Sequence, residues 1–298
     1  MVNGYIYIFF FHTYIRVNIL IGWTKVQEQR LKELNAELSD FDRLFSSQTE
    51  RDRAFQELEH QLVQKQRSRL EALRESLPQP ELIKLTDTLT ATLIENGFLQ
   101  VATPLLMSKG HLQKMSIDES HDLFEQVFWI DKKRCLRPML APHLYYVVQN
   151  LLRLWEPPVR IFEIGPCFRK ETKGAIHAAE FTMLNAAEFG LAKEERQSGL
   201  EEIISLAMTG AGIDDYQLAY EDSTVYGQTL DIVVGPEQME VGSASMGPHP
   251  LDAEWEIFTP WIGVGFGLER LLMYTHNTHN IRKVGRSLSY VQGIRLNI

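Results

Sequence analysis

The stretch Phe162–Glu188, near the middle of the chain, constrains the fold more than any other part of the sequence. Apolar residues up to Phe168 predict a buried strand, and the polar segment that contains Gly174 lets the chain reverse. Apolar residues that begin at Phe181 predict a returning strand. The pattern therefore predicts a long β-hairpin.

Two opposite charges follow the first strand of this hairpin. Arg169 and Glu171 lie two residues apart, so both side chains share one face of an extended strand. Burying them costs free energy unless a partner pairs with them, and a polyanionic ligand with hydrogen-bond donors, such as ATP, would be such a partner. An ordinary hairpin with an ion pair at its surface is the alternative, and this stretch alone does not decide between the two.

Length and composition limit the classes of protein. The 298 residues suffice for one large domain with an appendage, or for two domains, and 44% hydrophobic residues indicate a globular fold. The net charge of -9 argues against a coat for bulk nucleic acid but leaves a local basic patch possible. Cys135 and Cys167 form no CxxC pair, which argues against a zinc site or a disulfide framework. We therefore expect a cytoplasmic protein.

Residues 1–22 are strongly apolar, but Asn3, His12, Arg16 and Asn18 interrupt them. The basic start and the small-residue cleavage site of a signal peptide are not clear, and a membrane span needs about 20 nearly uninterrupted apolar residues. We expect an apolar extension that does not belong to the folded protein, as when translation is taken to start too far upstream.

Residues 23–80 are rich in Gln, Glu, Leu, Lys and Arg, which predicts a helical segment that ends in a linker at Pro78 and Pro80. Mixed charges along it are typical of a solvated helix face, so a helical appendage that packs on a larger domain is expected. The alternative is an arm that contacts nucleic acid through basic residues. Its candidates are Lys25, Arg30 and Lys32, or Lys65, Arg67 and Arg69.

Residues 81–298 predict an α+β domain. An amphipathic helix ends at Gly97, another begins at Pro142, and short apolar runs separated by turn residues predict an antiparallel sheet flanked by helices. The chain contains no GxSxG, HExxH or Walker A motif, and its glycines do not form GxGxxG. The glycines of 263–267 let a flat ring approach the backbone, and Arg270 just beyond them can stack on a base or contact a phosphate.

Three segments together resemble the signature of the class II aminoacyl-tRNA synthetases. Residues 97–104 resemble motif 1, which that family uses at its dimer interface. Residues 168–171 with the returning Glu180 and Phe181 resemble motif 2, and residues 263–270 resemble motif 3. Motif 1 alone is weak, but the ordered set is specific. The resemblance implies a class II catalytic core in residues 81–298, with the N-terminal helical segment as an appendage.

Six segments, three of which include the residues of motifs 2 and 3, are similar to the pyrrolysyl-tRNA synthetases, and the similarity covers most of residues 24–298. They are LRPMLAP (136–142), IFEIGPCFRKE (161–171), EFTMLN (180–185), VYG (225–227), PWIGVGFGLERLL (260–272) and RSLSY (286–290). From the resemblance we expect no counterpart of the small tRNA-binding domain that precedes the catalytic part in archaeal members. The chain resembles the bacterial catalytic protein, which works beside a separately encoded small tRNA-binding protein. The implied partners are tRNA(Pyl), pyrrolysine and a second copy of the chain, with no membrane.

Carried over residue by residue, the resemblance implies an ATP site. Arg169 would hold the α-phosphate, and Phe181 and Arg270 would stack on opposite faces of adenine. Glu240 and Ser243 match positions that bind Mg²⁺ and phosphate. Arg169 and Arg270 are the implied catalytic residues. The full expected ATP set is Arg169, Glu171, His177, Phe181, Glu240, Ser243, Gly267 and Arg270.

The resemblance also implies an amino-acid pocket, and two of its positions depart from the archaeal pattern. Ala187 stands where a cysteine is expected and Ser245 where a valine is expected, so the pocket shape should differ. The expected set is Ala141, Leu144, Tyr145, Val148, Asn185, Ala187, Tyr226, Ser245, Trp261 and Gly263.

The residue types of this pocket suit pyrrolysine, whose long neutral tail carries an amide and ends in a ring. The set offers apolar walls, Asn185 as an amide partner and no charge, so a charged substrate would stay unpaired. Tolerance for bulky lysine carbamates is expected. We expect adenylation of the substrate by ATP and its transfer to tRNA, without a dedicated general base. The alternatives are a synthetase for another amino acid, such as phenylalanine, and a non-catalytic tRNA-binding or regulatory protein.

Overall fold

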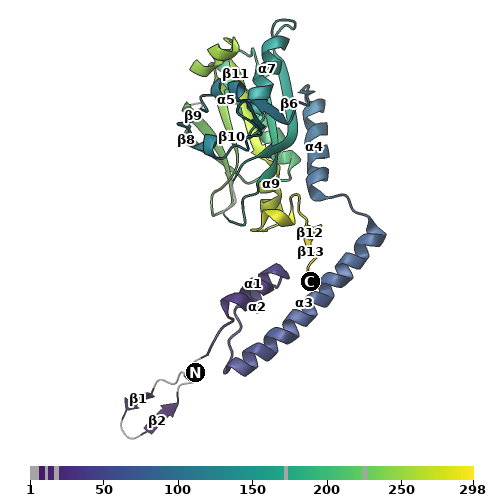
Figure 1. Ribbon diagram of the computed structural model, residues 1–298, viewed down its shortest axis with the longest axis vertical. Coiled ribbons are helices and arrows are strands. Elements are labelled where there is room, and N and C mark those ends of the chain that lie inside the picture. The colour runs from purple at the N-terminus through teal and green to yellow at the C-terminus, as the bar shows by residue number, and fades with distance from the viewer. Residues whose placement is uncertain (1–6, 11–12, 17–19, 171–173, 224–226) are drawn as a thin grey trace. The chain divides into compact units, whose positions relative to one another are not determined.

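The computed structural model describes the backbone of residues 7–10, 13–16, 20–170, 174–223 and 227–298, and the chain divides into two compact units (Figure 1). The N-terminal unit comprises Met1–Pro78 together with Ser289–Ile298, and the second unit comprises Gln79–Leu288. The expected boundary at residue 80 lies close to this division. Residues 289–298, in contrast, group with the N-terminal unit and not with residues 81–288.

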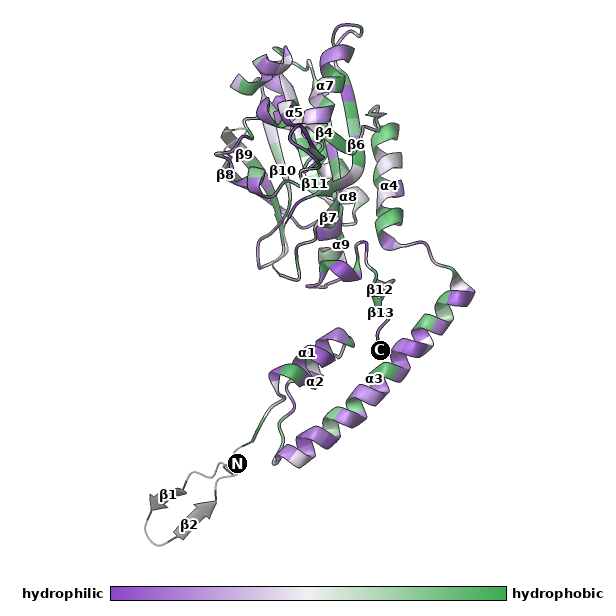
Figure 2. Cartoon of the chain, in the orientation of Figure 1, coloured by the Kyte–Doolittle hydropathy of each residue, from purple (hydrophilic) through white to green (hydrophobic). Residues whose placement is uncertain are grey.

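The N-terminal unit is mostly helical and has a small core. Its longest helix buries only Leu58, Leu62 and Gln66, and most of that helix has the colour of hydrophilic residues in Figure 2. The buried Gln66 side chain donates to the carbonyl of Leu34 at 2.8 Å. The elements of this unit are β1 (Tyr7–Phe10), β2 (Thr13–Arg16), α1 (Lys25–Glu33), α2 (Leu38–Phe41), α3 (Gln48–Ser76), β12 (Tyr290–Val291) and β13 (Ile294–Arg295).

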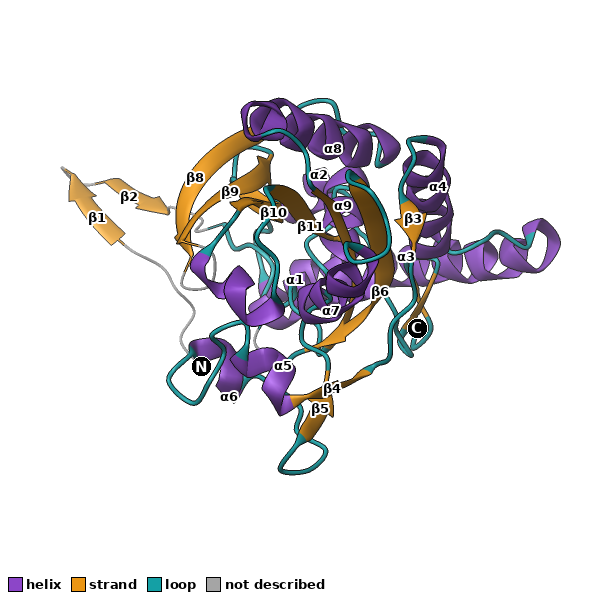
Figure 3. Cartoon of the chain, turned by 90° about the horizontal axis from the view of Figure 1, so that it is seen from above, coloured by secondary structure: helices purple, strands orange, loops and turns teal. Residues whose placement is uncertain are grey.

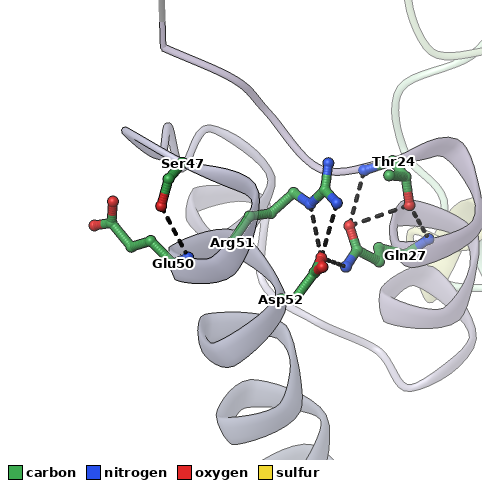
Figure 4. Close-up of polar contacts among 6 residues, drawn as sticks. All are labelled: Thr24, Gln27, Ser47, Glu50, Arg51 and Asp52. Atoms are coloured by element: carbon green, nitrogen blue, oxygen red, sulfur yellow. Dashed lines mark hydrogen bonds and ion pairs between the residues drawn. The ribbon is translucent and has the colours of Figure 1, made fainter. Parts of the chain in front are cut away.

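Side-chain caps set the starts of α1 and α3 (Figure 4). The Thr24 hydroxyl accepts from the Gln27 N–H at 3.2 Å, and the Gln27 side chain accepts from the Thr24 N–H at 3.0 Å, which is a capping box. At the start of α3 the Ser47 hydroxyl accepts from the Glu50 N–H at 3.2 Å. The Gln27 amide also donates to Asp52 on α3 at 3.0 Å, so one side chain caps α1 and ties it to α3.

No helix in the described ranges combines the length and the apolar character that crossing a membrane requires. The long helix α3 is one of the most polar elements, as Figure 2 shows.

A mixed sheet of seven strands forms the centre of the second unit in the described part of the chain, in the order β3-β6-β7-β11-β10-β9-β8. All neighbours are antiparallel except β3, which pairs with β6 in parallel. The expected α+β class is thus confirmed, with one parallel strand at the edge. The strands are β3 (Leu99–Gln100), β6 (Val159–Phe168), β7 (Glu180–Phe189), β8 (Gln217–Ser223), β9 (Gly227–Val234), β10 (Met239–Gly247) and β11 (Trp261–Gly267), and a separate pair consists of β4 (Leu106–Ser108) and β5 (Arg134–Leu136).

Helices cover both faces of this sheet (Figure 3). Because successive residues of a strand point to opposite faces, Ala186 and Ile262 join the core under α4, α8 and α9, whereas Ala187 and Trp261 join the core that includes α5 and α7. The helices are α4 (Glu81–Glu95), α5 (Lys109–Gln113), α6 (Asp122–Glu125), α7 (Ala141–Leu151), α8 (Arg196–Gly210) and α9 (Leu268–Thr275), with short 3-10 turns η1 (Lys193–Glu195), η2 (Pro250–Trp255) and η3 (Ile281–Lys283).

Candidate active site

A cavity of about 370 Å³ lies on the α7 side of the sheet, and β7 supplies one of its walls. Phe181, Met183, Asn185 and Ala187 all line it, and they are alternate residues of one strand. The period of two therefore places the expected adenine-stacking residue and the expected amide partner on the same face. The predicted hairpin exists as β6 and β7, which pair from Val159–Phe189 to Phe168–Glu180.

The floor of the cavity is formed by β11, whose alternate residues Trp261, Gly263, Gly265 and Gly267 line it. A Cβ on Gly265 would lie 2.9 Å from Oδ1 of Asn185, which is closer than real Cβ contacts. The glycine at this position leaves space for the Asn185 amide. The glycines of the motif 3 segment have no side chains that would extend into the cavity, so they leave space where the ligand would lie.

A β-bulge in β10 brings two further side chains to the cavity. In a regular strand Glu240 and Ser243, three residues apart, would face opposite sides of the sheet. The pairing with β9 shifts by one residue between Glu240 and Gly242. Val241 and Ala244 consequently both join the core on the α8 side, and Glu240 and Ser243 both line the cavity.

Charged side chains surround one end of the cavity. The Arg169 guanidinium lies 5.3 Å from the ring centroid of Phe181, and its Nε donates to the carbonyl of Pro138 at 3.0 Å. Arg270 donates to the Glu240 carboxylate at 3.1 Å. This ion pair is partly exposed, so a phosphate group from solution can compete for Arg270.

Glu269 links the returning strand of the hairpin to the start of α9. Both of its carboxylate oxygens accept from the backbone N–H of Thr182, at 2.9 and 2.8 Å. Burial raises the pKa of Glu269, against the lowering effect of these hydrogen bonds and of Arg286. The Arg286 side chain donates to the Thr182 hydroxyl at 2.7 Å. Glu269 therefore holds the backbone next to Phe181 and sets the first turn of the helix that carries Arg270.

Aromatic rings surround the other end of the cavity. Tyr145 on α7 and Trp261 on β11 are both buried and lie 5.9 Å apart in an edge-to-face arrangement. Phe189 stacks on Trp261 at 6.0 Å and meets Tyr145 edge-on at 6.2 Å. Offset and edge-to-face contacts are the favoured geometries between aromatic rings, so this wall is packed before any ligand enters.

A buried ion pair supports the strand behind the site. Arg137 donates to Glu163 on β6 at 2.6 Å, with about 2% and 3% of the two side chains exposed. Arg137 also donates to the Thr103 hydroxyl at 2.9 Å, and a Cβ on Gly165 would lie 2.2 Å from its guanidinium. The side-chain partners of Arg137 come either from the segment after β3 or from β6. The buried pair therefore holds that segment against β6.

His143 on α7 and His111 on α5 pack against each other, and burial lowers the pKa of each. The pKa of His143 falls to about 4 through burial, with smaller contributions from His111 and Arg137. Burial, and then Lys114, also lower the pKa of His111. The two rings lie 5.6 Å apart, edge to face. Both imidazoles are therefore neutral in the folded protein near neutral pH.

Burial also raises the pKa of both thiols, to about 11 for Cys135 and about 12 for Cys167. A buried thiol that keeps its proton is a poor nucleophile, so neither cysteine suits covalent catalysis.

Most of the expected site residues line this one cavity. Val148, which is on α7, does not line it and is fully buried in the adjoining core. Glu171 and Tyr226 lie outside the described residues. The residues brought together are Ala141, Leu144, Tyr145, Arg169, His177, Phe181, Asn185, Ala187, Glu240, Ser243, Ser245, Trp261, Gly263, Gly267 and Arg270.

Sequence reasoning missed Met183 and Gly265, which also line the cavity. The signal for both was the strand period of two. Met183 lies midway between Phe181 and Asn185, and Gly265 lies midway between the other two glycines of β11.

The Glu240 carboxylate and the Ser243 hydroxyl fit a magnesium ion. Mg²⁺ prefers oxygen ligands, and in nucleotide sites it takes one or two protein groups together with phosphates and water. The described residues contain no cluster of three His, Cys, Asp or Glu side chains that would form a metal site without a nucleotide. The donor set therefore suits an ion that arrives with ATP.

Comparison with known proteins places this cavity in a family. The sequence matches the family described as tRNA synthetases class II core domain (F) over residues 18–293. Among curated relatives, the phenylalanine--tRNA ligase alpha subunit of Thermosynechococcus vestitus is 27% identical over 151 residues, which cover 49% of this chain and 44% of that protein. The threonine--tRNA ligase of Wolbachia pipientis subsp. Culex pipiens is 26% identical over 147 residues, covering 44% and 22%. The chain thus spans less than half the length of these two relatives.

Solved structures give matches over nearly the whole chain. The crystal structure of pyrrolysyl-tRNA synthetase from Desulfitobacterium hafniense is 52% identical, with a TM-score of 0.86, and the match covers 93% of this chain and 99% of that one. A structure of Desulfitobacterium hafniense PylSc, a pyrrolysyl tRNA synthetase, is 49% identical, with a TM-score of 0.85, and the match covers 97% and 100%. Fold, motifs and identity agree, and the chain belongs to the class II aminoacyl-tRNA synthetases and, among them, to the pyrrolysyl-tRNA synthetases.

Proposed function

We propose that this chain is a pyrrolysine--tRNA ligase, which joins pyrrolysine to its amber-decoding tRNA(Pyl) at the expense of ATP. One observation carries the proposal. A single cavity has charged side chains at one end and buried aromatic rings at the other, and one face of β7 runs along both. Such a cavity can hold ATP and a long neutral amino acid side by side, which adenylation requires.

The nucleotide would lie at the charged end. Arg169 would hold the α-phosphate, while Phe181 and Arg270 would pack on the two faces of adenine. His177 and Gly267 line the same end, and Glu171 completes the proposed ATP set from outside the described residues. The proposal gains support from the partly exposed Arg270–Glu240 pair, because Arg270 can exchange its partner without unfolding anything.

Pyrrolysine would lie at the aromatic end. Among the described residues proposed for that end, none carries a charge, and Asn185 offers an amide to the amide of the pyrrolysine tail. Ala187 and Ser245 are small and line the cavity, which leaves more room than a cysteine and a valine would. We therefore propose that bulky lysine carbamates are also substrates. Tyr226 and Val148 belong to the proposed set, Val148 as a residue behind the wall.

The reaction would take place in two steps. A carboxylate oxygen of the amino acid attacks the α-phosphorus of ATP, and the bond to the β-phosphate oxygen breaks, giving aminoacyl-adenylate and pyrophosphate. The terminal ribose hydroxyl of the tRNA then attacks the acyl carbon and AMP leaves. Arg169 and Arg270 would offset the phosphate charge that must accumulate. Mg²⁺ bound with ATP at Glu240 and Ser243 would neutralise further phosphate charge.

We also propose the partners of this enzyme. A second copy would pack on the motif 1 face, where Ile94 and Leu99 expose 51% and 42% of their surface beside the edge strand β3. A separately encoded small protein would contribute further tRNA contacts, and the complex would work in the cytoplasm. The helical segment 23–80 would be an appendage of the catalytic domain, and residues 1–22 an extension not needed for activity.

Charging of tRNA tests the proposal directly. The purified chain, incubated with ATP and pyrrolysine, should aminoacylate amber-decoding tRNA(Pyl), and it should leave tRNA(Phe) uncharged when given phenylalanine. Pyrophosphate exchange with a panel of amino acids measures the first step separately. Exchange with phenylalanine alone would make the chain a synthetase for another amino acid. Binding of tRNA(Pyl) without exchange or charging would make it a tRNA-binding protein.

A further inference from the structure

A buried carboxylate that does not line the cavity connects Tyr145 and Trp261, two of the aromatic residues at the amino-acid end. Asp252 in η2 is 1% exposed. Its Oδ1 accepts from the Tyr145 hydroxyl at 2.9 Å, and its Oδ2 accepts from the indole N–H of Trp261 at 2.6 Å. Oδ2 also accepts from the backbone N–H of His249 at 2.6 Å. This side chain therefore joins η2 to β11, which is close in the sequence, and to α7, whose Tyr145 lies 107 residues away.

Burying a carboxylate costs free energy that an apolar side chain of similar size would not cost. Asp252 meets this cost with three donors, two of which are the polar atoms of Tyr145 and Trp261. Aromatic side chains with a polar atom need a partner for it when they are buried. Without Asp252 the hydroxyl and the indole N–H would lose this acceptor, and both rings line the cavity.

The backbone holds Asp252 in place before any ligand binds. Its N–H donates to the carbonyl of His249 at 2.9 Å, and its carbonyl accepts from the N–H of Ile257 at 3.1 Å. His249 and Asp252 form the capping box of η2, each side chain accepting from the backbone of the other end of the turn. The position of the carboxylate is thus set by the turn and not by the two rings.

The strand below Trp261 restricts the indole from its other side. Gly247 on β10 pairs with Trp261, and a Cβ at Gly247 would lie 1.7 Å from the indole nitrogen. The indole therefore lies against the bare backbone of Gly247 with its N–H directed to Asp252. The orientation of the ring follows from these two contacts together.

We propose that Asp252 is the positioning residue that sets the specificity of the amino-acid end for long apolar tails. It turns the polar atoms of Tyr145 and Trp261 away from the cavity, so the rings offer the ligand only hydrocarbon. The inference rests on the proposed function, because the ligand class follows from it. Asp252 acts through the two rings, and substrate binding is the property it controls, whereas ATP binds at the other end.

The test separates substrate binding from general damage to the protein. In pyrophosphate exchange, Asp252→Ala should raise KM for pyrrolysine by about tenfold, the effect of losing one hydrogen bond to a charged group, and leave KM for ATP unchanged. Asp252→Asn should stay within about threefold of wild type, because its amide oxygen can accept from Trp261 and His249 and its NH₂ can donate to the Tyr145 hydroxyl.

Rescue by asparagine should depend on the Tyr145 hydroxyl. In a Tyr145→Phe background the NH₂ of Asn faces no acceptor, so Asp252→Asn should now raise KM for pyrrolysine by about tenfold. This pair of variants keeps the test decisive even if Asp252→Ala does not fold. Glu188→Gln is the matched control, because Glu188 is a buried acid that pairs with Arg160 at 3.0 Å and lies on β7 next to Ala187, on the face opposite the cavity.

The outcomes are distinct. A fall in active fraction or Tm for Asp252→Ala with an unchanged KM for pyrrolysine would overturn the inference, as would equal KM changes for Glu188→Gln. If wild type activates no pyrrolysine but another amino acid, the proposed function fails. The same comparison of KM values with that amino acid then decides the role of Asp252.

Discussion

The two ends of the cavity differ in how their side chains are held. At the nucleotide end Arg270 and Glu240 leave 32% and 49% of their side chains exposed and pair with each other. At the amino-acid end Tyr145 and Trp261 are 4% and 3% exposed and pack against further rings. Charged groups that stay in contact with water can change partners when ATP binds. Packed rings cannot rearrange easily, so the space between them must fit the ligand before it binds.

This difference has a consequence for mutations. A change at the charged end should remove an interaction with the nucleotide and leave the fold intact, because its side chains contribute little to the core. A change at the aromatic end should alter stability and substrate choice together, because the same contacts serve both. Three changes test this contrast, in order of decreasing effect.

Removing the Arg169 guanidinium from the charged end should have the largest effect on activity. Arg169→Ala should lower the rate of pyrophosphate exchange by about a hundredfold to a thousandfold, because one preorganised donor to the reacting phosphate is lost. Its Tm should stay close to that of wild type. Arg134→Ala is the control, because Arg134 pairs with Asp131 at the surface and its loss should change neither quantity. Exchange at the wild-type rate in Arg169→Ala would remove this residue from the proposed mechanism.

Low pH should lower the stability of the protein by protonating His143, a buried residue of α7. The pKa of its imidazole is about 4 in the folded protein and near 6.5 when unfolded, so the unfolded chain binds more protons between these values. The free energy of unfolding should therefore fall as the pH drops from 6.5 to 4, by roughly 3 kcal/mol at about 1.4 kcal/mol per pKa unit.

Urea unfolding of His143→Asn at several pH values measures this contribution. The variant should lose less stability than wild type over that range, although the lowered pKa of His111 leaves part of the slope. His279→Asn, at an exposed position, should follow the wild-type curve. Parallel curves for wild type and His143→Asn would show that the acid sensitivity arises elsewhere.

A methyl group under the indole should have a smaller effect. In Gly247→Ala the new Cβ would lie 1.7 Å from Nε1 and 2.2 Å from Cε2 of Trp261, so the ring must move. We expect a loss of about 1–3 kcal/mol in the free energy of unfolding, the usual range for overpacking. KM for the amino acid should rise more than KM for ATP.

Gly110→Ala is the matched control, because the nearest atom to its Cβ would be the Ser108 hydroxyl at 3.8 Å. This variant should be as stable as wild type or slightly more stable, since alanine favours a helix over glycine. Equal rises of both KM values in Gly247→Ala would contradict the separation of the two ends.

Much of the charged end could be predicted from the sequence. The hairpin around Arg169 depends on a local pattern of apolar residues and a glycine, and the strand that leads to Arg270 depends on spaced glycines. Each pattern spans only about ten residues, so it can be recognised in the sequence without knowing which segments pack against it. The same period of two, continued along β7 and β11, also predicts that Met183 and Gly265 face the cavity.

The remainder depends on which segments meet in space. Val148 shares a helix face with Leu144, yet Leu144 lines the cavity while Val148 is buried in the adjoining core. The parallel pairing of β3 and the grouping of residues 289–298 with the N-terminal unit are likewise contacts between distant segments. Local patterns contain no information about such pairings.

The sequence by itself determined the α+β class and the hairpin, because periodicity is a local property. The charged residues proposed to meet ATP and the small neutral residues proposed for the pocket were implied by its resemblance to the class II synthetases. Only the tertiary structure decided that a bulge at Val241 turns Glu240 and Ser243 to one face, and that Asp252 holds Tyr145 and Trp261. The physical reason is that the bulge depends on how β10 pairs with β9, and that the carboxylate meets the Tyr145 hydroxyl from 107 residues away, so both depend on partners outside their own segment.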